Sequence, residues 1–290
     1  MLNGDWLQTL AAVVDHGTFE AAARRLTVTP SAVSQRIRAL EQAVGHVVVT
    51  RANPCRPTEQ GAVLLGLARG TAALEADALG RLAGGDGEGA GRVALDVAVN
   101  ADSLATWFTD VIAEVAGAGP RLRLYVDDEG HTADLLRSGA VLGAITVDPE
   151  PVQGCSAEYL GAMRYVPVCT AEFAQRWRRG DRWPWREMPT VQLDEKDQLQ
   201  NRILQRHRAI GAPPEHRIPT SDAFTRAVRV GLGWGNVPVA HLGDDLETGR
   251  MVRVDRDLTV RLYWQSWRLR TRASDRLTDA IHAAAAEHLE

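Results

Sequence analysis

Residues 29–45 concentrate side chains that can donate hydrogen bonds to phosphate groups and to the edges of DNA bases. The polar members are Thr29, Ser31, Ser34, Gln35, Arg36 and Arg38. Between them the apolar residues Val33, Ile37, Leu40 and Val44 recur every three or four positions. This spacing places one apolar stripe along a helix and leaves the polar set exposed. The pattern indicates a helix that reads DNA, although a solvated surface helix carries the same pattern.

A second set of polar residues follows the first strand expected in the second half of the chain. Asn100, Asp102 and Ser103 lie where this strand ends and a helix begins, the edge at which open α/β sheets bind small molecules. A serine hydroxyl and adjacent N–H groups suit a carboxylate, and Asp102 has the charge needed for an ammonium or guanidinium. Either Asp102 or Ser103 can also be no more than the N-cap of the helix.

Short helices predicted over residues 6–14 and 19–26 precede the polar helix. Thr29 suits its N-cap, Pro30 its first turn and Gly45 its end. Two helices joined by a tight turn, the second with a polar face, form a helix-turn-helix.

A strand and a loop complete this unit. Residues 47–51 are mostly β-branched and predict a strand, and residues 52–57 contain two prolines, as in a hairpin loop or wing. Arg51 and Arg56 extend the set of DNA-binding candidates. We therefore expect a winged helix-turn-helix DNA-binding domain over residues 1–58.

A long helix and a glycine-rich segment come next. Thr58 suits the N-cap of a helix that runs to about residue 82, within a linker and dimerisation segment over 59–83. Its apolar stripe comprises Val63, Leu64, Leu67, Leu74, Ala78, Leu79 and Leu82. Such a stripe favours pairing with a second chain, and the alternative is packing on the chain's own winged domain. Residues 84–91 contain five glycines and predict a flexible hinge.

From residue 92 onward the pattern alternates between strands and helices, including a helix over 104–115. This order predicts right-handed crossovers and a mostly parallel sheet. We expect an effector-binding domain of two α/β lobes over 92–290, similar to a periplasmic binding protein, with the chain crossing twice between lobes. Lobe I would comprise about 92–163 and 268–290, and lobe II about 164–267. Trp107 and Trp234 could wall a pocket between them, although core packing is the expected role of at least one.

The composition excludes several classes of protein. The chain has 290 residues, 45% hydrophobic content, three widely spaced cysteines and a net charge of −4. Residues 1–60 carry six arginines and five acidic residues. DNA binding must therefore depend on the positions of individual arginines and not on the net charge of this segment. No membrane span, signal peptide, metal-ligand spacing, nucleophile elbow or phosphate-binding loop is recognisable. We therefore expect a cytoplasmic protein that is not an enzyme, with reduced structural thiols.

The order of these elements resembles the LysR-type transcriptional regulators. Residues 21–26, 29–37, 40–41 and 57–61 match the family's N-terminal signature almost throughout. Residues 47–51 depart from it, because Leu-Phe and a bulky residue are commoner before the arginine. In the second half, residues 99–107, 143–146, 160–165, 231–235 and 262–265 are similar to the ArgP/LysG-type branch. Members of that branch sense lysine and arginine and control amino-acid exporters.

The resemblance implies a basic amino acid as effector and no cofactor. With such a ligand, Asp128 or Glu129 would face the positive charge of its side chain. The other candidate effector-binding residues are Asn100, Thr146, Asp194, Ser221 and Asp222. Ser221 and Asp222 lie at the start of a predicted helix, and capping that helix is the alternative role for both. The implied partners are double-stranded promoter DNA, a second copy of the chain in a dimer or tetramer, and RNA polymerase. A LysR-type regulator with another effector and a solute-binding protein are the alternatives.

Overall fold

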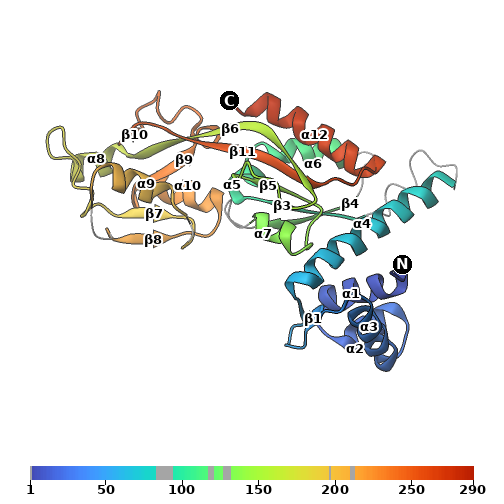
Figure 1. Cartoon of the computed structure of the whole chain (residues 1–290). Helices are drawn as coiled ribbons and strands as arrows, with labels where there is room; N and C mark the ends of the chain where they lie inside the picture. The colour runs from blue at the N-terminus through green and yellow to red at the C-terminus, as the bar shows by residue number, and fades with distance from the viewer. Residues whose placement is uncertain (1, 83–93, 117–120, 127–131, 196, 210–212) are drawn as a thin grey trace.

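The computed structural model describes residues 2–82, 94–116, 121–126, 132–195, 197–209 and 213–290. A small helical unit carries the N-terminus, and a long helix connects it to two α/β lobes (Figure 1). The predicted hinge over 84–91 and the candidates Asp128 and Glu129 lie outside the described residues.

The N-terminal unit is a winged helix-turn-helix. Its elements are α1 (Gly4–His16), α2 (Phe19–Leu26), α3 (Pro30–Val44), β1 (Val49–Thr50) and β2 (Arg56–Pro57). Strand β1 pairs antiparallel with β2, but the strand expected over 47–51 is only two residues long. The cause is local, because the Val48 N–H donates to Glu41 and the Val48 carbonyl accepts from the Thr58 N–H. These bonds tie residue 48 to the flanking helices instead of to a sheet.

Helix α4 (Glu59–Leu82) has the predicted N-cap. The Thr58 hydroxyl accepts from the Gly61 N–H at 3.0 Å. The sequence left open whether the apolar residues of α4 pack on the winged unit or face outward, and both occur. Leu65 is fully buried in the winged unit. The exposed apolar residues are Val63, Leu67, Leu74, Leu79 and Leu82. Helix α4 therefore packs on its own winged unit and still presents an apolar stripe outward.

The lobes share one seven-stranded sheet of order β10-β6-β11-β5-β3-β4, with β9 also paired to β6. Its strands are β3 (Ala94–Val99), β4 (Arg121–Val126), β5 (Gly143–Thr146), β6 (Cys155–Thr170), β9 (Gly235–Pro238), β10 (Met251–Arg253) and β11 (Leu258–Trp267). The prediction of a mostly parallel sheet is wrong: among the described strands of this sheet only β3, β4 and β5 pair in parallel, and every pairing of β6 and β11 is antiparallel. These two long strands run through both lobes and provide the two crossings (Figure 1).

Helices cover the sheet and position the polar residues. Lobe I carries α5 (Ala101–Ala105), α6 (Phe108–Ala116), α7 (Thr132–Arg137) and α12 (Arg272–His288). Lobe II carries α8 (Ala171–Trp177), α9 (Leu199–Arg206), α10 (Ser221–Arg229) and α11 (Val239–Leu242), with the parallel pair β7 (Thr190–Gln192) and β8 (Glu215–Arg217). No described helix has the length and apolar character that a membrane crossing needs.

The single helix predicted over 104–115 is wrong, because the chain forms α5 and α6 with a break at Thr106. The Thr106 hydroxyl donates to the Asp102 carbonyl at 2.6 Å, and Thr106 has a non-helical ψ of −100°. The break turns Trp107 into the core, where it is 2% exposed. It also leaves α5 as a short separate helix between the lobes.

Candidate functional site

Helix α3 has the predicted caps and the predicted buried face. The Thr29 hydroxyl accepts from the Ala32 N–H at 3.2 Å, and Gly45 adopts a left-handed φ of 73° at the helix end. Val33, Ile37 and Leu40 are buried against α1 and α2. The outward residues are Thr29, Ser31, Gln35 and Arg38, which are exposed, and Ser34, which is half-buried. These side chains form one surface that faces away from the core of the winged unit.

Arg36 differs from its neighbours on α3. Its guanidinium donates to the Asp5 carboxylate at 3.1 Å and approaches the Thr9 hydroxyl at 3.5 Å. Its side chain is 28% exposed. Arg36 therefore ties α3 to α1, and Arg38 is the more accessible arginine of the helix.

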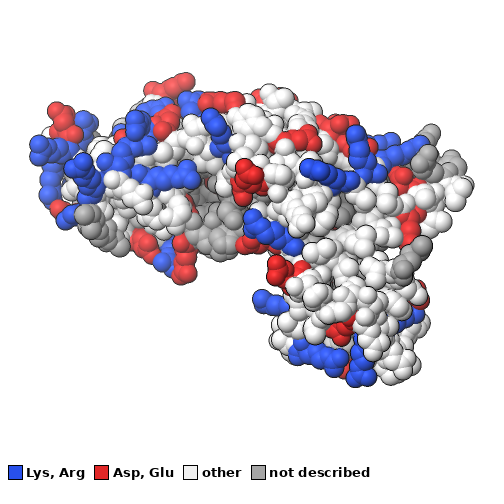
Figure 2. Space-filling view, viewed as in Figure 1, with Lys and Arg blue, Asp and Glu red and all other residues white. Residues whose placement is uncertain are grey.

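The wing adds two arginines next to this surface. Arg51 and Arg56 are exposed on either side of the β1–β2 connection. The Thr50 hydroxyl donates to the Arg56 carbonyl at 2.9 Å, and the Arg51 guanidinium lies 5.6 Å from the Phe19 ring centre. Basic side chains lie at the lower end of the winged unit, where α2 and α3 lie, whereas both signs are mixed over the lobes (Figures 1 and 2).

Asp102 forms a polar contact between the lobes. From α5, one carboxylate oxygen accepts from the Ser221 hydroxyl of α10 at 2.5 Å, and the other accepts from the Tyr165 hydroxyl of β6 at 2.9 Å. The structure thus brings together the two candidates Asp102 and Ser221. Tyr165 was missed among the candidate residues; its fully buried hydroxyphenyl group comes from the middle of β6 and not from the end of a strand.

Two further candidates lie beside Asp102. Asn100 precedes α5 and is 2% exposed, and Ser103 is fully buried. The Ser103 hydroxyl has no hydrogen-bond partner among the described residues. Because a buried hydroxyl without a partner is costly, Ser103 is suited to bind a polar group of a ligand.

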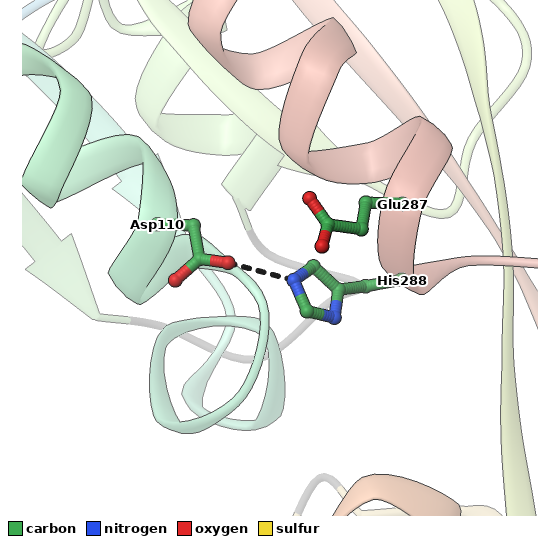
Figure 3. Close-up of side chains that lie close together, drawn as sticks. All are labelled: Asp110, Glu287 and His288. Carbon is green, nitrogen blue, oxygen red and sulfur yellow. Dashed lines mark hydrogen bonds and ion pairs between the residues drawn. The ribbon is translucent and has the colours of Figure 1, made fainter.

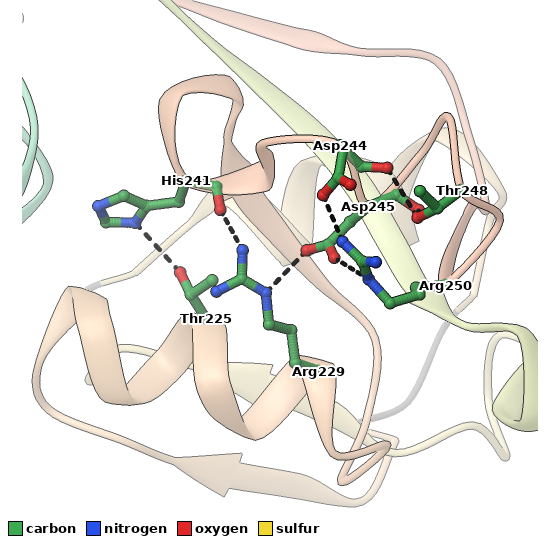
Figure 4. Close-up of polar contacts among 7 residues, drawn as sticks. All are labelled: Thr225, Arg229, His241, Asp244, Asp245, Thr248 and Arg250. Carbon is green, nitrogen blue, oxygen red and sulfur yellow. Dashed lines mark hydrogen bonds and ion pairs between the residues drawn. The ribbon is translucent and has the colours of Figure 1, made fainter.

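His241 makes a second contact between the lobes and was also missed. From α11, its ring nitrogens lie 3.2 Å from the Thr225 hydroxyl of α10 and 3.2 Å from the Ala105 carbonyl of α5; Figure 4 shows the contact with Thr225. Asp222, one of the candidates, is exposed and lies 3.8 Å from the same ring. Helices α5 and α10 therefore meet through Asp102 and through His241.

The remaining described candidates have other surroundings. Thr146 is fully buried, and its hydroxyl donates to the Asp148 carbonyl at 3.2 Å. Asp194 accepts from the Asp197 N–H at 3.0 Å, in the turn after β7. Trp107 and Trp234 both belong to the core, where Trp234 meets Trp185 edge to face.

Lobe II contains a charged network next to α10. The buried Asp245 carboxylate accepts from Arg229 at 2.7 Å and from Arg250 at 2.8 Å, and Arg229 also donates to the His241 carbonyl (Figure 4). Burial acts to raise the pKa of Asp245, but the hydrogen bonds from Arg250 and Arg229 outweigh it and hold this pKa below its usual value. The network fixes α11, and with it His241, against α10.

A surface cluster on lobe I has the residue types of a metal site. Asp110, Glu287 and His288 converge from α6 and α12, and the His288 ring lies 2.7 Å from the Asp110 carboxylate (Figure 3). All three are exposed, and an aspartate–histidine hydrogen bond accounts for their proximity.

The thiols of Cys55, Cys155 and Cys169 are free and buried, as expected. Burial raises the pKa of Cys155 to about 11 and that of Cys169 to about 12. Both thiols are therefore protonated and unreactive at neutral pH.

Both halves of the chain match known families. Residues 5–62 match the family described as bacterial regulatory helix-turn-helix protein, lysR family, and residues 87–287 match the LysR substrate binding domain. The chain belongs to the LysR family. It is thus a transcriptional regulator with a DNA-binding and an effector-binding domain, and not an enzyme.

Relatives of this LysR-family chain resemble it along nearly its whole length. The lysine export transcriptional regulatory protein LysG of Corynebacterium efficiens is 45% identical, with 98% of each chain covered. Full-length LysG of Corynebacterium glutamicum with bound effector Arg is 39% identical, covers 99% of each chain and has a TM-score of 0.85. ArgP of Mycobacterium tuberculosis is 43% identical, covers 100% of this chain and 99% of its own, and has a TM-score of 0.89.

Proposed function

We propose that this regulator senses a basic amino acid, arginine or lysine, and controls a gene for amino-acid export. The observation that carries the proposal is the Asp102 carboxylate, which lies between the lobes in contact with Ser221 and Tyr165. Its negative charge suits an ammonium or guanidinium group. The relatives add support, since one is named for lysine export and another has Arg as bound effector.

The ligand would insert its cationic group at Asp102. A guanidinium can donate two hydrogen bonds to one carboxylate, and this charge-assisted pair is stronger than a neutral one. The Ser221 hydroxyl would then lose its present acceptor or share it, so binding bears directly on the contact between α5 and α10. The Ser103 hydroxyl, which has no partner among the described residues, would bind a polar group of the same ligand. Asn100, Thr146, Asp128, Glu129, Asp194 and Asp222 remain further candidates.

The winged unit would read DNA through the outward face of α3 and the wing. Its contacts would come from Thr29, Ser31, Ser34, Gln35, Arg36, Arg38, Arg51 and Arg56. Because one winged unit offers few contacts with DNA, two copies of the chain joined through α4 would be needed to bind a DNA site made of two half-sites. We infer a dimer, and a tetramer as a pair of dimers. Contact with RNA polymerase would follow at the promoter.

The division into functional parts follows from the same proposal. Residues 1–58 would bind DNA, 59–83 would join two copies, 84–91 would act as a hinge and 92–290 would bind the effector. The chain would act in the cytoplasm, where promoter DNA is found. The lobe limits near 164 and 267 fall within β6 and at the end of β11, two strands that both lobes share.

Isothermal titration calorimetry of the full chain tests the effector. Wild type is titrated with arginine, lysine and histidine, and with citrulline, which has arginine's shape without its charge. We expect Asp102→Asn to weaken arginine binding by about 10- to 100-fold, because a hydrogen bond to a charged group contributes about 1.5–3 kcal/mol. DNA affinity without effector should stay near that of wild type.

Asp181→Asn is the matched control, because Asp181 is fully exposed on lobe II, where it pairs with Arg178. Equal arginine affinity in Asp102→Asn and wild type would remove Asp102 from the site. If no basic amino acid produced heat with wild type, the effector would be another small molecule and the assignment as a LysR regulator would stand.

A further inference from the structure

An arginine-rich segment follows α8 at the end of lobe II. Residues 176–186 contain five arginines and one acidic residue, whereas residues 1–60, with the winged unit, contain six arginines and five acidic residues. In Figure 2 basic side chains gather at the left end of the molecule, where Figure 1 shows α8. All five arginines are exposed, and together we call them the arginine turn: Arg176, Arg178, Arg179, Arg182 and Arg186.

The backbone holds two of these arginines side by side. The Arg179 N–H donates to the Arg182 carbonyl at 2.9 Å, and the Arg182 N–H donates to the Arg179 carbonyl at 3.1 Å. Gly180 permits the tight turn between them with a left-handed φ of 60°. Opposite residues of an antiparallel pair project their side chains to the same face, where like charges repel each other. An anion bound across the two guanidinium groups would remove this repulsion.

The neighbouring carboxylates neutralise only part of the charge. The exposed Asp181 lies 3.4 Å from Arg178, and Glu187 lies 2.7 Å from Arg179. Such exposed ion pairs are weak, because water competes for both partners. Within the described part of the chain, the arginines of the turn without an ion pair are Arg176, Arg182 and Arg186. The turn thus presents three positive charges that no carboxylate of the described residues offsets.

Aromatic residues fix the arginine turn on the core of lobe II. On one side, the Trp177 and Phe173 rings pack with 6.0 Å between their centres. On the other side, Trp185 is 8% exposed, stacks on the His207 ring at 4.5 Å and meets Trp234 edge to face. A segment anchored at both ends loses less conformational freedom on binding than a loose loop does. The positive charges are therefore held in place before any partner arrives.

The character of this surface favours phosphate groups over a protein partner. Protein interfaces have an apolar core, but among the described residues no large apolar side chain between positions 171 and 189 is exposed. Phosphates are bound by charge and hydrogen bonds alone, and one guanidinium can donate two hydrogen bonds to a phosphate. Since the chain has the helix-turn-helix domain of a DNA-binding regulator, the DNA backbone is the polyanion that best fits the turn.

We propose that the arginine turn is a second DNA-binding surface, which contacts the phosphate backbone outside the half-site that α3 reads. The turn lies at the end of lobe II away from the winged unit (Figure 1), so it meets another part of the duplex. Such contacts carry no sequence information, but they add affinity that falls steeply with salt. The proposal rests on the proposed reading of DNA by α3 and not on the identity of the effector.

The double variant Arg182→Gln/Arg186→Gln tests this surface in the full-length protein. It breaks no ion pair among the described residues, so the fold should persist. Operator DNA is selected from a random library with wild type, and affinity is measured by fluorescence anisotropy at several salt concentrations. On a duplex of about 150 bp, one persistence length of DNA, we expect affinity to fall about tenfold or more. The salt slope should decrease by about two units for each chain that contacts the DNA.

A shorter duplex and a matched variant serve as controls. On a duplex trimmed to the two half-sites, Arg182→Gln/Arg186→Gln should bind like wild type, because the outer phosphates are gone. Arg226→Gln/Arg261→Gln removes the same charge from exposed positions of the effector-binding domain and should keep the wild-type slope on the long duplex. An equal loss in this control, or an equal loss on the trimmed duplex, would overturn the second surface.

A DNA-cleaving group attached to the turn locates the contact. Asp181 is fully exposed and the native cysteines are buried, so Asp181→Cys provides a reactive thiol for an iron–EDTA group, which cuts DNA only nearby. We expect cuts outside the half-sites that disappear when Arg182→Gln/Arg186→Gln is added. Val230→Cys, at a residue of lobe II that is 81% exposed, is the matched control and should give none.

The outcomes separate this proposal from the proposed function. A wild-type salt slope in Arg182→Gln/Arg186→Gln, with no cuts from position 181, would refute the second surface alone. Binding of poly-glutamate that this variant loses, at a wild-type DNA slope, would assign the turn to an acidic protein and overturn the DNA contact. A wild type that selects no operator would refute the proposed reading of DNA together with the second surface.

Discussion

Single residues in lobe II show how a buried charge is held between two arginines. Asp245 is 4% exposed and accepts hydrogen bonds from Arg229 and Arg250 (Figure 4). Its pKa is below the usual value although burial opposes this, because both arginines donate to it. Removing the carboxylate would leave two guanidinium groups in each other's vicinity. The network is therefore a stability element that also supports His241.

The substitution Asp245→Asn should lower the free energy of unfolding at pH 7 by about 1.5–3 kcal/mol, the range for a hydrogen bond to a charged group. A carboxyl whose pKa is depressed by folding stabilises the protein above its unfolded pKa of about 3.9 and loses this contribution as pH falls through the folded value. The difference from wild type should therefore shrink below about pH 4. Urea unfolding at pH 7, 5 and 3.5 measures it.

Asp244→Asn serves as the control in this experiment, because Asp244 also pairs with Arg250 but its side chain is 62% exposed. It should have a much smaller effect. A loss in Asp245→Asn that stayed constant from pH 7 to pH 3.5 would contradict the assigned ion pairs.

At the level of elements, α3 contains two arginines in different environments. Arg38 is exposed, whereas Arg36 is bonded to Asp5 of α1. Arg38 is thus available to a phosphate, and each phosphate contact contributes about one unit to the slope of log affinity against log salt. Arg36 contributes to the packing of α3 on α1 as well as to any contact with DNA.

We expect Arg38→Ala to weaken DNA binding and to reduce the salt slope by about two units in a dimer, with unchanged thermal stability. Arg36→Ala should lower the melting temperature of the winged unit in addition to weakening DNA binding. Fluorescence anisotropy between 50 and 300 mM salt, together with differential scanning calorimetry, separates these effects. An unchanged salt slope in Arg38→Ala would place this residue away from the phosphates.

Local signals made several elements predictable from the sequence. The hydroxyls of Thr29 and Thr58 cap the expected helices, Gly45 ends α3, and the apolar spacing identified the buried face of α3. Each of these features depends on residues within one or two turns. Asp102 and Ser221 were predicted by a related argument, because each lies where a helix begins, and the structure brings their side chains into contact.

Features that depend on distant residues were not predictable. Tyr165 bonds to Asp102 across 63 positions, and His241 meets the Ala105 carbonyl across 136. The mixed direction of the sheet depends on β6 and β11, whose pairing the local pattern does not encode. The spacing of apolar residues over 104–115 also did not predict the break at Thr106, because the break depends on the burial of Trp107 in the core. Long-range contacts therefore account for most of the differences between expectation and structure.

At the scale of the whole molecule, α4 has two faces with different surroundings. Gly66 and Gly70 face lobe I, whereas Val63, Leu67 and Leu74 point outward and are 60%, 47% and 44% exposed. In the proposed dimer these exposed apolar residues, which lie four and seven positions apart along one helix, would form the interface with the second chain. A second copy that paired through the outward face would leave Gly66 and Gly70 in contact with lobe I.

The double variant Leu67→Glu/Leu74→Glu should therefore dissociate the assembly while preserving the fold of each chain. Two carboxylates in an apolar helix pair lose solvation without gaining partners. Sedimentation equilibrium should show a lower mass, and operator affinity should fall by about 100-fold or more, because two half-sites are no longer bound through one molecule. Arginine affinity should stay near wild type, since α4 lies outside the proposed effector site.

Val230→Glu is the matched control, because Val230 is 81% exposed in lobe II. An unchanged mass in the double variant would mean that the outward face of α4 does not join two chains, and the two-part DNA site would then need another interface.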